Sequence, residues 1–171
     1  MKTLIAYYSR AGENYVGGQI RSLSEGNTKR AAQMIAASTG ADLFEIKQRI
    51  PYSDRYNECI AQAQADQRND VRPALTALPE NWDAYDEIYL GYPNYWNTMP
   101  MAVFTFLDSL DWTGKTIHPF CTNEGSGMGR SLTDLKRLCP QAAVTAGLSI
   151  YGSQIAHARS TIEAYVKQFN S

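Results

Sequence analysis

The sequence has no long apolar run, no block of like charge and no closely spaced cysteine pair, and each of these absences excludes a class of protein. No apolar stretch approaches the ~18 residues that a membrane-spanning helix needs. The apolar run that begins at Thr3 ends by Ser9 without a small-residue cleavage pattern, so we expect no secretory signal. The 16 basic and 17 acidic residues nearly cancel. We therefore expect neither nucleic acid nor a membrane surface as a partner, but a small molecule or another protein.

Cysteine and histidine are scarce and scattered. Cys59, Cys121 and Cys139 have no CxxC spacing, and an odd number of cysteines argues against a disulfide framework. We therefore expect reduced thiols and a cytoplasmic location. His118 and His157 have no Cys, His, Asp or Glu at a metal-ligand spacing, so no metal site is predicted.

The chain of 171 residues, 44% of them hydrophobic, is long enough for one well-buried core, and we expect a single domain over residues 1–171. Short apolar segments alternate five times with segments of helical periodicity, which is typical of an α/β fold with a doubly wound parallel sheet and helices on both faces. The expected strands are 3–8, 41–46, 87–91, 115–121 and 142–150. The expected helices are 28–39, from Ser53 or Asp54 to about Arg68, from Pro100 through Leu107, 130–138 and 153–169.

Two segments depart from this regular pattern. Residues 69–86 contain prolines and many polar side chains, which predicts a long surface connection held down by Leu75, Leu78 and Trp82. Pro119 lies inside the fourth expected strand. Because proline has no N–H for a sheet hydrogen bond, we expect a bulge or a one-sided strand end there.

Three loops that follow expected strands have an unusual composition. In a doubly wound sheet, ligands bind at the carboxyl ends of the strands. The loop from Ser9 has small and hydroxyl residues before a helix, a composition typical of a phosphate site. Residues 92–100 supply tyrosine and tryptophan, and residues 122–129 supply glycine. Together these loops predict one ligand with a phosphate, a flat aromatic ring and a polyol between them.

Without residues 13–25, the first loop would be Ser9-Arg-Ala-Gly-Asn-Thr, which resembles the phosphate loop of the flavodoxin family. The Gly91-Tyr-Pro turn with the Tyr-Trp pair that follows it, and the Glu124-Gly-Ser-Gly loop, are also similar to that family. The resemblance covers essentially the whole chain. It implies a five-stranded, flavodoxin-like sheet of order 2-1-3-4-5 and one bound FMN.

The resemblance also implies which residues hold FMN. The phosphate is expected at amides and hydroxyls near the start of the first helix, and the flavin ring between the loops after the third and fourth strands. Asn94 is expected to allow a positive φ in the first of these two loops. The insertion, residues 13–25, leaves open whether Gly12 or Gly26 takes the tight position, and we hypothesise that it forms a lid or an interface beside the cofactor. The predicted FMN-binding residues are Ser9, Ala11, Gly12, Gly26, Asn27, Thr28, Pro93, Asn94, Tyr95, Trp96, Thr122, Asn123, Glu124, Gly125 and Gly127.

These features also have structural explanations. Ser9 and Thr28 are common helix-capping residues, and Tyr95 and Trp96 could simply pack in the core. The glycines of residues 125–129 resemble a dinucleotide-binding fingerprint, but that motif belongs after the first strand. A receiver domain, which shares this topology, would have acidic residues where Ser9 stands. The cofactor interpretation is favoured because all three loops meet at one edge of the sheet.

Three functions stay open for such a protein. The family resemblance favours an electron carrier between redox partner proteins, although the net charge of -1 is unlike that of an acidic shuttle protein. The second is an oxidoreductase that takes hydride from NAD(P)H and reduces a quinone or similar small acceptor. Its substrate wall would be formed by Tyr92, Tyr95 and Trp96 together with the insertion. The third is a non-enzymatic, FMN-dependent interaction module. The sequence identifies no catalytic residue and leaves the oligomeric state open, a dimer included.

Overall fold

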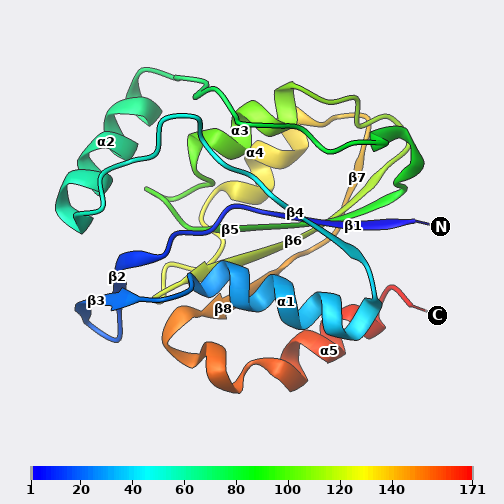
Figure 1. Cartoon of the computed structure of the whole chain (residues 1–171). Helices are drawn as coiled ribbons and strands as arrows, with labels where there is room; N and C mark the ends of the chain where they lie inside the picture. Colours follow the sequence, from blue (N-terminus) through cyan, green and yellow to red (C-terminus); the bar gives the residue numbers. More distant parts are fainter. Residues whose placement is uncertain (1, 171) are drawn as a thin grey trace.

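The computed structural model describes residues 2–170, and these contain a parallel sheet of six strands. β1 lies between β4 and β5, β6 pairs with β5, and both β7 and β8 pair with β6 (Figure 1). If β7 and β8 are counted as one interrupted strand, this is the predicted order 2-1-3-4-5. The strands are β1 (Thr3–Tyr7), β4 (Asp42–Glu45), β5 (Glu87–Pro93), β6 (Thr116–Asn123), β7 (Ala143–Val144) and β8 (Leu148–Tyr151).

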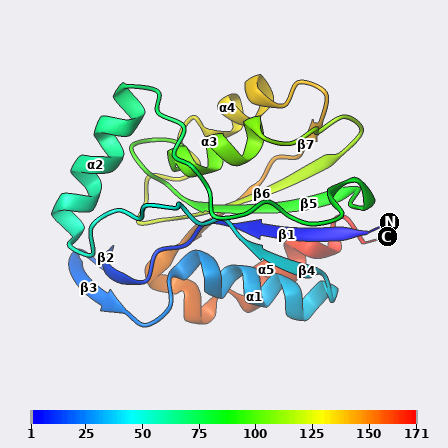
Figure 2. The same cartoon turned by 45° about the horizontal axis from the view of Figure 1, so that its top comes forward.

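Helices cover both faces of the sheet, as predicted (Figures 1 and 2). α1 and α5 pack on one face around one core cluster, and α3 and α4 pack on the other face around a second cluster. α2 stands apart from these two layers, beside the edge of the sheet. The helices are α1 (Asn27–Thr39), α2 (Tyr56–Arg68), α3 (Met101–Asp108), α4 (Ser131–Leu138) and α5 (Arg159–Lys167), with short 3₁₀ helices η1 (Trp82–Ala84) and η2 (Gly152–His157).

β1 is buried on both faces, as its continuous apolar composition predicted. Leu4 and Ala6 belong to the core beneath α3 and α4, whereas Ile5 and Tyr7 belong to the core beneath α1 and α5. This alternation follows from the geometry of a strand, in which successive side chains point to opposite faces. The carboxyl end of β1 therefore leads from the middle of the sheet into the predicted phosphate loop.

The fifth predicted strand is interrupted, and the interruption lies beside Pro119. The pairing of β5 with β6 runs unbroken through Pro119, opposite Leu90. On the other side, Ile117 pairs with Val144 and Phe120 pairs with Leu148. Three residues therefore lie between β7 and β8 opposite two residues of β6, which is one residue more than a regular pairing has. Pro119 has no N–H to donate, and its carbonyl accepts a hydrogen bond from the Tyr165 hydroxyl at 2.8 Å. The expected irregularity is therefore present, but in the neighbouring strand.

The closing helix is also divided, because η2 precedes α5 where one helix over 153–169 was predicted. Ile155 and Ala158 are both buried, at 3% and 7% exposure. A 3₁₀ turn places residues three apart on the same side, so it directs both side chains into the core. Ile162 continues this buried face from α5.

The predicted long connection after α2 contains η1 as its short helical turn. Trp82 is buried and Leu75 packs against the same core, as expected. The prediction is wrong for Leu78, which is 42% exposed. Instead, the Arg72 side chain donates to Asp108 at 2.6 Å and holds this segment to α3.

The insertion forms an antiparallel hairpin of β2 (Gly12–Val16) and β3 (Gln19–Leu23). Gly17 and Gly18 at its tip have φ values of 61° and 83°. Two successive positive φ values suit a tight turn whose twist matches the strands, and glycine adopts them without strain. Figure 2 shows the hairpin at the same end of the molecule as the start of α1 and α2.

Candidate functional site

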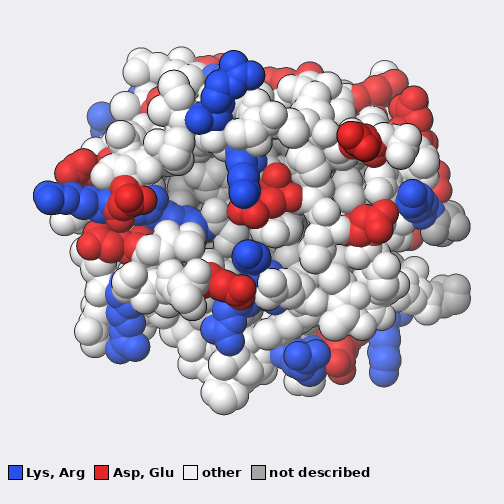
Figure 3. Space-filling model, in the orientation of Figure 1, with Lys and Arg blue, Asp and Glu red and all other residues white. Residues whose placement is uncertain are grey.

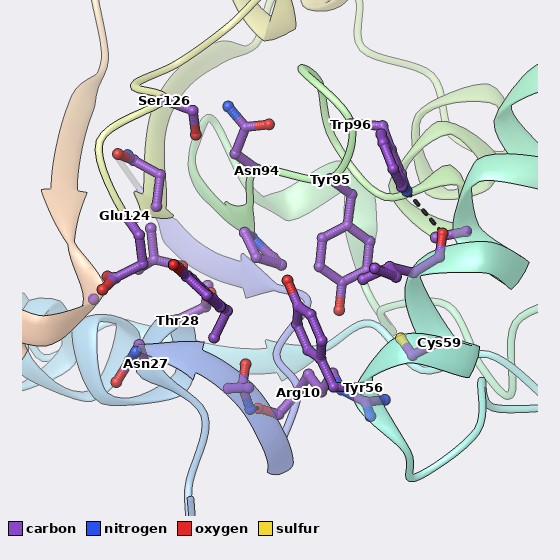
Figure 4. Close-up of a pocket in the computed structure, with 18 residues that line it drawn as sticks. Arg10, Asn27, Thr28, Tyr56, Cys59, Asn94, Tyr95, Trp96, Glu124 and Ser126 are labelled. Atoms are coloured by element: carbon purple, nitrogen blue, oxygen red, sulfur yellow. Dashed lines mark hydrogen bonds between the residues drawn. The ribbon is translucent and has the colours of Figure 1, made fainter. Parts of the chain in front are cut away.

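A cleft of about 320 Å³ lies at the carboxyl edge of the sheet, and three predicted loops meet there as expected (Figure 4). This volume is within the range of about 300–1,000 Å³ that is usual for small-molecule sites. The N-terminus of α1, the hairpin and α2 complete its walls. The predicted residues that line it are Asn27, Thr28, Pro93, Asn94, Tyr95, Trp96, Thr122, Asn123 and Glu124.

Ser9 and Gly26 support the start of α1 from behind the cleft. The Ser9 hydroxyl oxygen accepts a hydrogen bond from the Lys29 amide at 3.0 Å. A Cβ atom on Gly26 would collide with that hydroxyl and with the Arg10 carbonyl, whereas the space around Gly12 is open and its φ is 81°. Gly26 therefore takes the tight position, and Gly12 provides the positive φ at which the hairpin begins.

The start of α1 presents donors to the cleft. The first amides of a helix have no partner within the helix, and those of Asn27 and Thr28 find none elsewhere in residues 2–170. The Thr28 and Thr122 hydroxyls lie 2.7 Å apart, so one donates to the other and one proton remains for a ligand. The first turn of α1 has no acidic residue among those described, which leaves the positive end of the helix dipole uncompensated. These groups fit a phosphate, and we call them the phosphate cradle.

The loop after β6 is folded by the side chain of Asn123. Its Oδ1 atom accepts hydrogen bonds from the amides of Gly125 and Gly127, at 2.9 and 3.0 Å. Asn94 donates from Nδ2 to the Gly127 carbonyl at 2.9 Å and so connects this loop to the loop after β5. The amides of Gly125 and Gly127 are therefore used within the loop, and neither glycine lines the cleft. Ala11 and Gly12 also lie outside the lining, at the exposed start of the hairpin.

The loop after β5 places Tyr95 and Trp96 over the cleft. Positive φ values occur at Trp96 (51°) and Asn97 (74°) in this loop and not at Asn94. The Asn94 side chain instead accepts from the Asn97 amide at 2.9 Å, which shapes the turn. The Trp96 ring nitrogen donates to the Ile60 carbonyl of α2 at 2.8 Å (Figure 4). This bond fixes the orientation of a side chain that is 41% exposed at the mouth of the cleft.

α2 and the hairpin form a further wall, of which the inserted segment was predicted and α2 was not. The Tyr56 amide donates to the Glu13 carboxylate at 2.7 Å, and the rings of Tyr15 and Tyr56 lie 6.2 Å apart. A signal was available, because α2 also follows a strand of the sheet, and the loops after all strands gather at this edge. The lining residues that were not among the predicted FMN-binding residues are Arg10, Asn14, Tyr15, Tyr56, Cys59, Ile60, Ala63, Ser126 and Gly152.

Glu124 joins the hairpin to the other side of the cleft. Its carboxylate accepts from the Gly17 amide at 2.7 Å and from the Ser153 amide at 3.0 Å. The tip of the hairpin is thereby held against the start of η2, next to Asn27. The insertion therefore lies beside the phosphate cradle, which is the position that a lid over the cofactor requires.

Burial controls the protonation of the groups at the aromatic end of the cleft. Desolvation raises the pKa of the Cys59 thiol, an effect that Arg10 partly offsets. Desolvation also raises the pKa of Tyr95 well above its ordinary value of 10.0. Both groups are therefore neutral hydrogen-bond donors at physiological pH.

Residues 2–170 contain no group of three or more His, Cys, Asp or Glu side chains that could hold a metal ion. Cys59, Cys121 and Cys139 are free and buried. In the same residues, no helix has the length and apolar composition needed to cross a membrane.

This sheet order, with a phosphate cradle after β1 and aromatic side chains after β5, defines a flavodoxin-like protein of the mononucleotide-binding type. The family model described as Flavodoxin matches residues 2–169. The chain therefore belongs to the flavodoxin family, and this membership supports the predicted cofactor, FMN.

Solved structures show the same fold. A protein of Bacteroides uniformis that was proposed to be a flavoprotein is 27% identical, with 97% of each chain covered and a TM-score of 0.76. A corresponding protein of Bacteroides eggerthii is 28% identical, with 94% of this chain and 97% of that chain covered and a TM-score of 0.72. A flavoprotein of Lactobacillus acidophilus in complex with FMN is 18% identical, with 93% and 98% covered and a TM-score of 0.67. No curated protein matches the chain.

Proposed function

We propose that the protein is an FMN-dependent oxidoreductase that passes electrons to a small acceptor bound beside the flavin. The observation that supports this proposal is the division of the cleft into two chemically different ends (Figure 4). Asn27, Thr28 and Glu124 lie at one end, and Tyr56, Cys59 and Trp96 lie at the other. FMN accounts for the phosphate end and for the part of the second end next to Tyr95, whereas the wall formed by α2 and the hairpin extends that end further.

The residues present fit FMN. The amides of Asn27 and Thr28 and the unused hydroxyl proton of the Thr28–Thr122 pair would hold the phosphate, and Ser9 would support them by accepting the Lys29 amide. Tyr95 would flank the flavin ring from the loop after β5. When bound, FMN supplies reversible uptake of one or two electrons, which the side chains of this cleft do not supply themselves. The protein's own part is to orient the ring and to limit the access of water.

The wall formed by α2 and the hairpin supports a small acceptor. Tyr15, Tyr56 and Trp96 provide apolar surface around a space that is open at its mouth. Flat aromatic molecules such as quinones bind well against such side chains. NAD(P)H is the proposed electron donor. The free, buried thiols fit a reducing compartment, and we propose a cytoplasmic location.

A one-electron carrier between redox proteins is the second candidate. It is favoured by the exposed Trp96 and Tyr15, at 41% and 47%, which would give a partner protein access to the cleft mouth. Charge does not add to this argument, because positive and negative side chains are interspersed over the face shown in Figure 3. The net charge of -1 likewise provides little electrostatic steering.

Two measurements on the purified protein test the proposal. Titration of the FMN-free protein with FMN should show saturable binding with one equivalent. Steady-state oxidation of NADPH with menadione should then proceed much faster than with the same concentration of free FMN. FMN binding without this turnover would favour the carrier, and absence of FMN binding would contradict both candidates.

A further inference from the structure

The base of the hairpin is attached to the start of α2. The Glu13 carboxylate accepts a hydrogen bond from the Tyr56 amide at 2.7 Å. Tyr56 is the first residue of α2, so this carboxylate also lies at the positive end of the helix dipole. The Arg10 guanidinium donates to the Glu13 carbonyl at 2.9 Å and to the Asp54 carbonyl at 3.0 Å. Figure 2 shows the hairpin between the start of α2 and the start of α1. A displacement of the hairpin therefore acts directly on α2.

α2 itself buries little of its surface. Its buried residues are Cys59 and Ala63, and neither has a large side chain. The cleft lies on one side of α2. A second cavity of about 450 Å³ also borders α2 and is lined by Gln62, Asp66 and residues 48–52 and 73–74. A helix that buries little apolar surface opens at a low free energy, and the two cavities leave space in which it can shift.

Glu124 holds the other end of the hairpin. One carboxylate oxygen accepts from the Gly17 amide at 2.7 Å, and the other accepts from the Ser153 amide at 3.0 Å. Gly152 lies between Glu124 and Asn27, since a Cβ atom there would be 2.9 Å from Oε2 of Glu124 and 2.5 Å from Nδ2 of Asn27. The carboxylate is thus next to the phosphate cradle (Figure 4).

This position of Glu124 is electrostatically unfavourable for a phosphate. A carboxylate repels a phosphate, and Glu124 is the acidic side chain among the residues that line the cleft. A neutral side chain in its place would suit the cradle better. The two hydrogen bonds give the carboxylate a different role, because they join the tip of the hairpin to η2 across the phosphate end of the cleft.

We propose that the hairpin and α2 form one closing unit, residues 12–23 and 56–68, and that Glu124 holds this unit closed over FMN. Glu124 acts through the Gly17 amide and is therefore a positioning residue. When its bond to Gly17 breaks, the hairpin opens, α2 opens with it through Glu13, and the cofactor is released. This inference rests on the FMN binding of the proposed function and specifies how the chain retains the cofactor.

Glu124→Gln separates this role from simple repulsion. The two bonds use different carboxylate oxygens, and the amide has one oxygen, so the variant keeps at most one of them while it loses the negative charge. Repulsion alone predicts slower release of FMN from the variant. The proposal predicts release about two- to tenfold faster in stopped-flow fluorescence, as expected for one lost hydrogen bond. Unchanged or slower release would overturn the proposal.

Glu163→Gln is the matched control. Glu163 is an exposed residue of α5 and does not line the cleft. This variant should release FMN at the wild-type rate. An equal acceleration in the control would also contradict the proposal, because the effect would then not depend on the position of Glu124.

Hydrogen exchange of the FMN-free protein tests whether α2 moves with the hairpin. Glu124 has no hydrogen bond to α2 among the described residues, yet Glu124→Gln should speed the exchange of the α2 amides severalfold. The amides of α5 should exchange at the wild-type rate, which shows that the fold is intact. Faster exchange that is confined to the hairpin would overturn the proposal.

Glu13→Ala breaks the link between the hairpin and α2. The amides of α2 should exchange faster in this variant, and adding Glu124→Gln should then speed exchange in the hairpin but not further in α2. A further increase in α2 would contradict transmission through Glu13. Because exchange is measured without cofactor, it decides the closing unit by itself. Failure of the wild type to oxidise NADPH with menadione would contradict the proposed function alone.

Discussion

The Ser9 hydroxyl oxygen accepts the Lys29 amide proton at 3.0 Å, although the hairpin separates these two residues in the sequence. Lys29 is the third residue of α1, the position whose amide an N-cap side chain usually accepts. Gly26, the N-cap residue itself, has no side chain to do so. Ser9 therefore caps α1 from the end of β1 and holds the two halves of the phosphate cradle together.

The double substitution Ser9→Ala and Thr28→Ala should weaken FMN binding by well over tenfold. The Thr28 hydroxyl can contribute about 1.5–3 kcal/mol toward a charged phosphate, and Ser9 holds the donor amides of the cradle in place. Ser9→Ala should also lower the free energy of unfolding by about 0.5–2 kcal/mol through loss of the cap. Fluorescence titration measures the FMN affinity, and thermal unfolding measures the stability.

Thr39→Ala is the control. The Thr39 hydroxyl donates to the Ile35 carbonyl at the far end of α1, so this substitution should leave FMN affinity unchanged. Near-wild-type FMN affinity of the double variant would contradict the cradle.

The two glycines of the phosphate loop should respond differently to alanine. Gly26→Ala introduces a Cβ into the space occupied by the Ser9 hydroxyl and the Arg10 carbonyl, so we expect about 1–3 kcal/mol of destabilisation and severe loss of FMN binding. Gly12→Ala meets open space but must adopt a φ of 81°, which costs about 1–2 kcal/mol without altering the cradle. Urea unfolding and FMN titration of both variants compare these costs. Similar loss of FMN affinity in both would be inconsistent with a distinct tight position at Gly26.

Much of the fold follows from short-range patterns in the sequence. β1 could be predicted because Leu4 and Ala6 face one core and Ile5 and Tyr7 the other, which requires a continuous apolar run. The edge at which the loops meet follows from the topology of a doubly wound sheet. The strand order came from the family resemblance, because periodicity does not determine which strands are neighbours.

Other features depend on contacts that are distant in the sequence. The guanidinium of Arg10 is oriented by the Asp54 carbonyl, 44 residues away, and this contact exists only once α2 is placed at the sheet edge. Gly125 and Gly127 were predicted to bind FMN, but their amides donate to the Asn123 side chain. The hairpin could have been predicted from the sequence, because a Gly-Gly pair such as Gly17-Gly18 between two short strand-like segments is a known signal of a hairpin turn.

Deleting residues 13–25 to join Gly12 with Gly26 should preserve folding but shorten the lifetime of bound FMN. The strands of the hairpin add little to the buried core, whereas its tip contacts Glu124 beside the cradle. Stopped-flow release of FMN should therefore accelerate severalfold. Ile20→Ser is the control, because Ile20 is 46% exposed and a lid does not need it. If that substitution changes the oligomeric state while FMN release is normal, the hairpin is an interface and not a lid.

His118 should make the protein less stable in acid. The ring is 1% exposed, lies between Glu87 and Thr145, and stacks on Phe169 with ring centroids 3.8 Å apart. Desolvation lowers its pKa below the ordinary value of 6.5, and the Glu87 carboxylate partly offsets this effect. The ionised Glu87 can only accept, so Nε2 carries the proton of the neutral ring and Nδ1 accepts from the Thr145 hydroxyl.

The sign of the pH effect follows from this lowered pKa. Above pH 6.5 the ring is neutral in both the folded and the unfolded chain, and stability is complete. As the pH falls below that value, the unfolded chain takes up a proton before the folded chain does, so stability is lost until the folded pKa is passed. Each 1 kcal/mol lost lowers Tm by about 2–4 °C in a domain of this size.

Thermal unfolding between pH 7 and pH 5 should show a smaller decrease in Tm for His118→Gln than for the wild type. His157→Gln should keep the wild-type decrease, because His157 is exposed. Identical pH profiles for the wild type and His118→Gln would show that another group controls stability in this range.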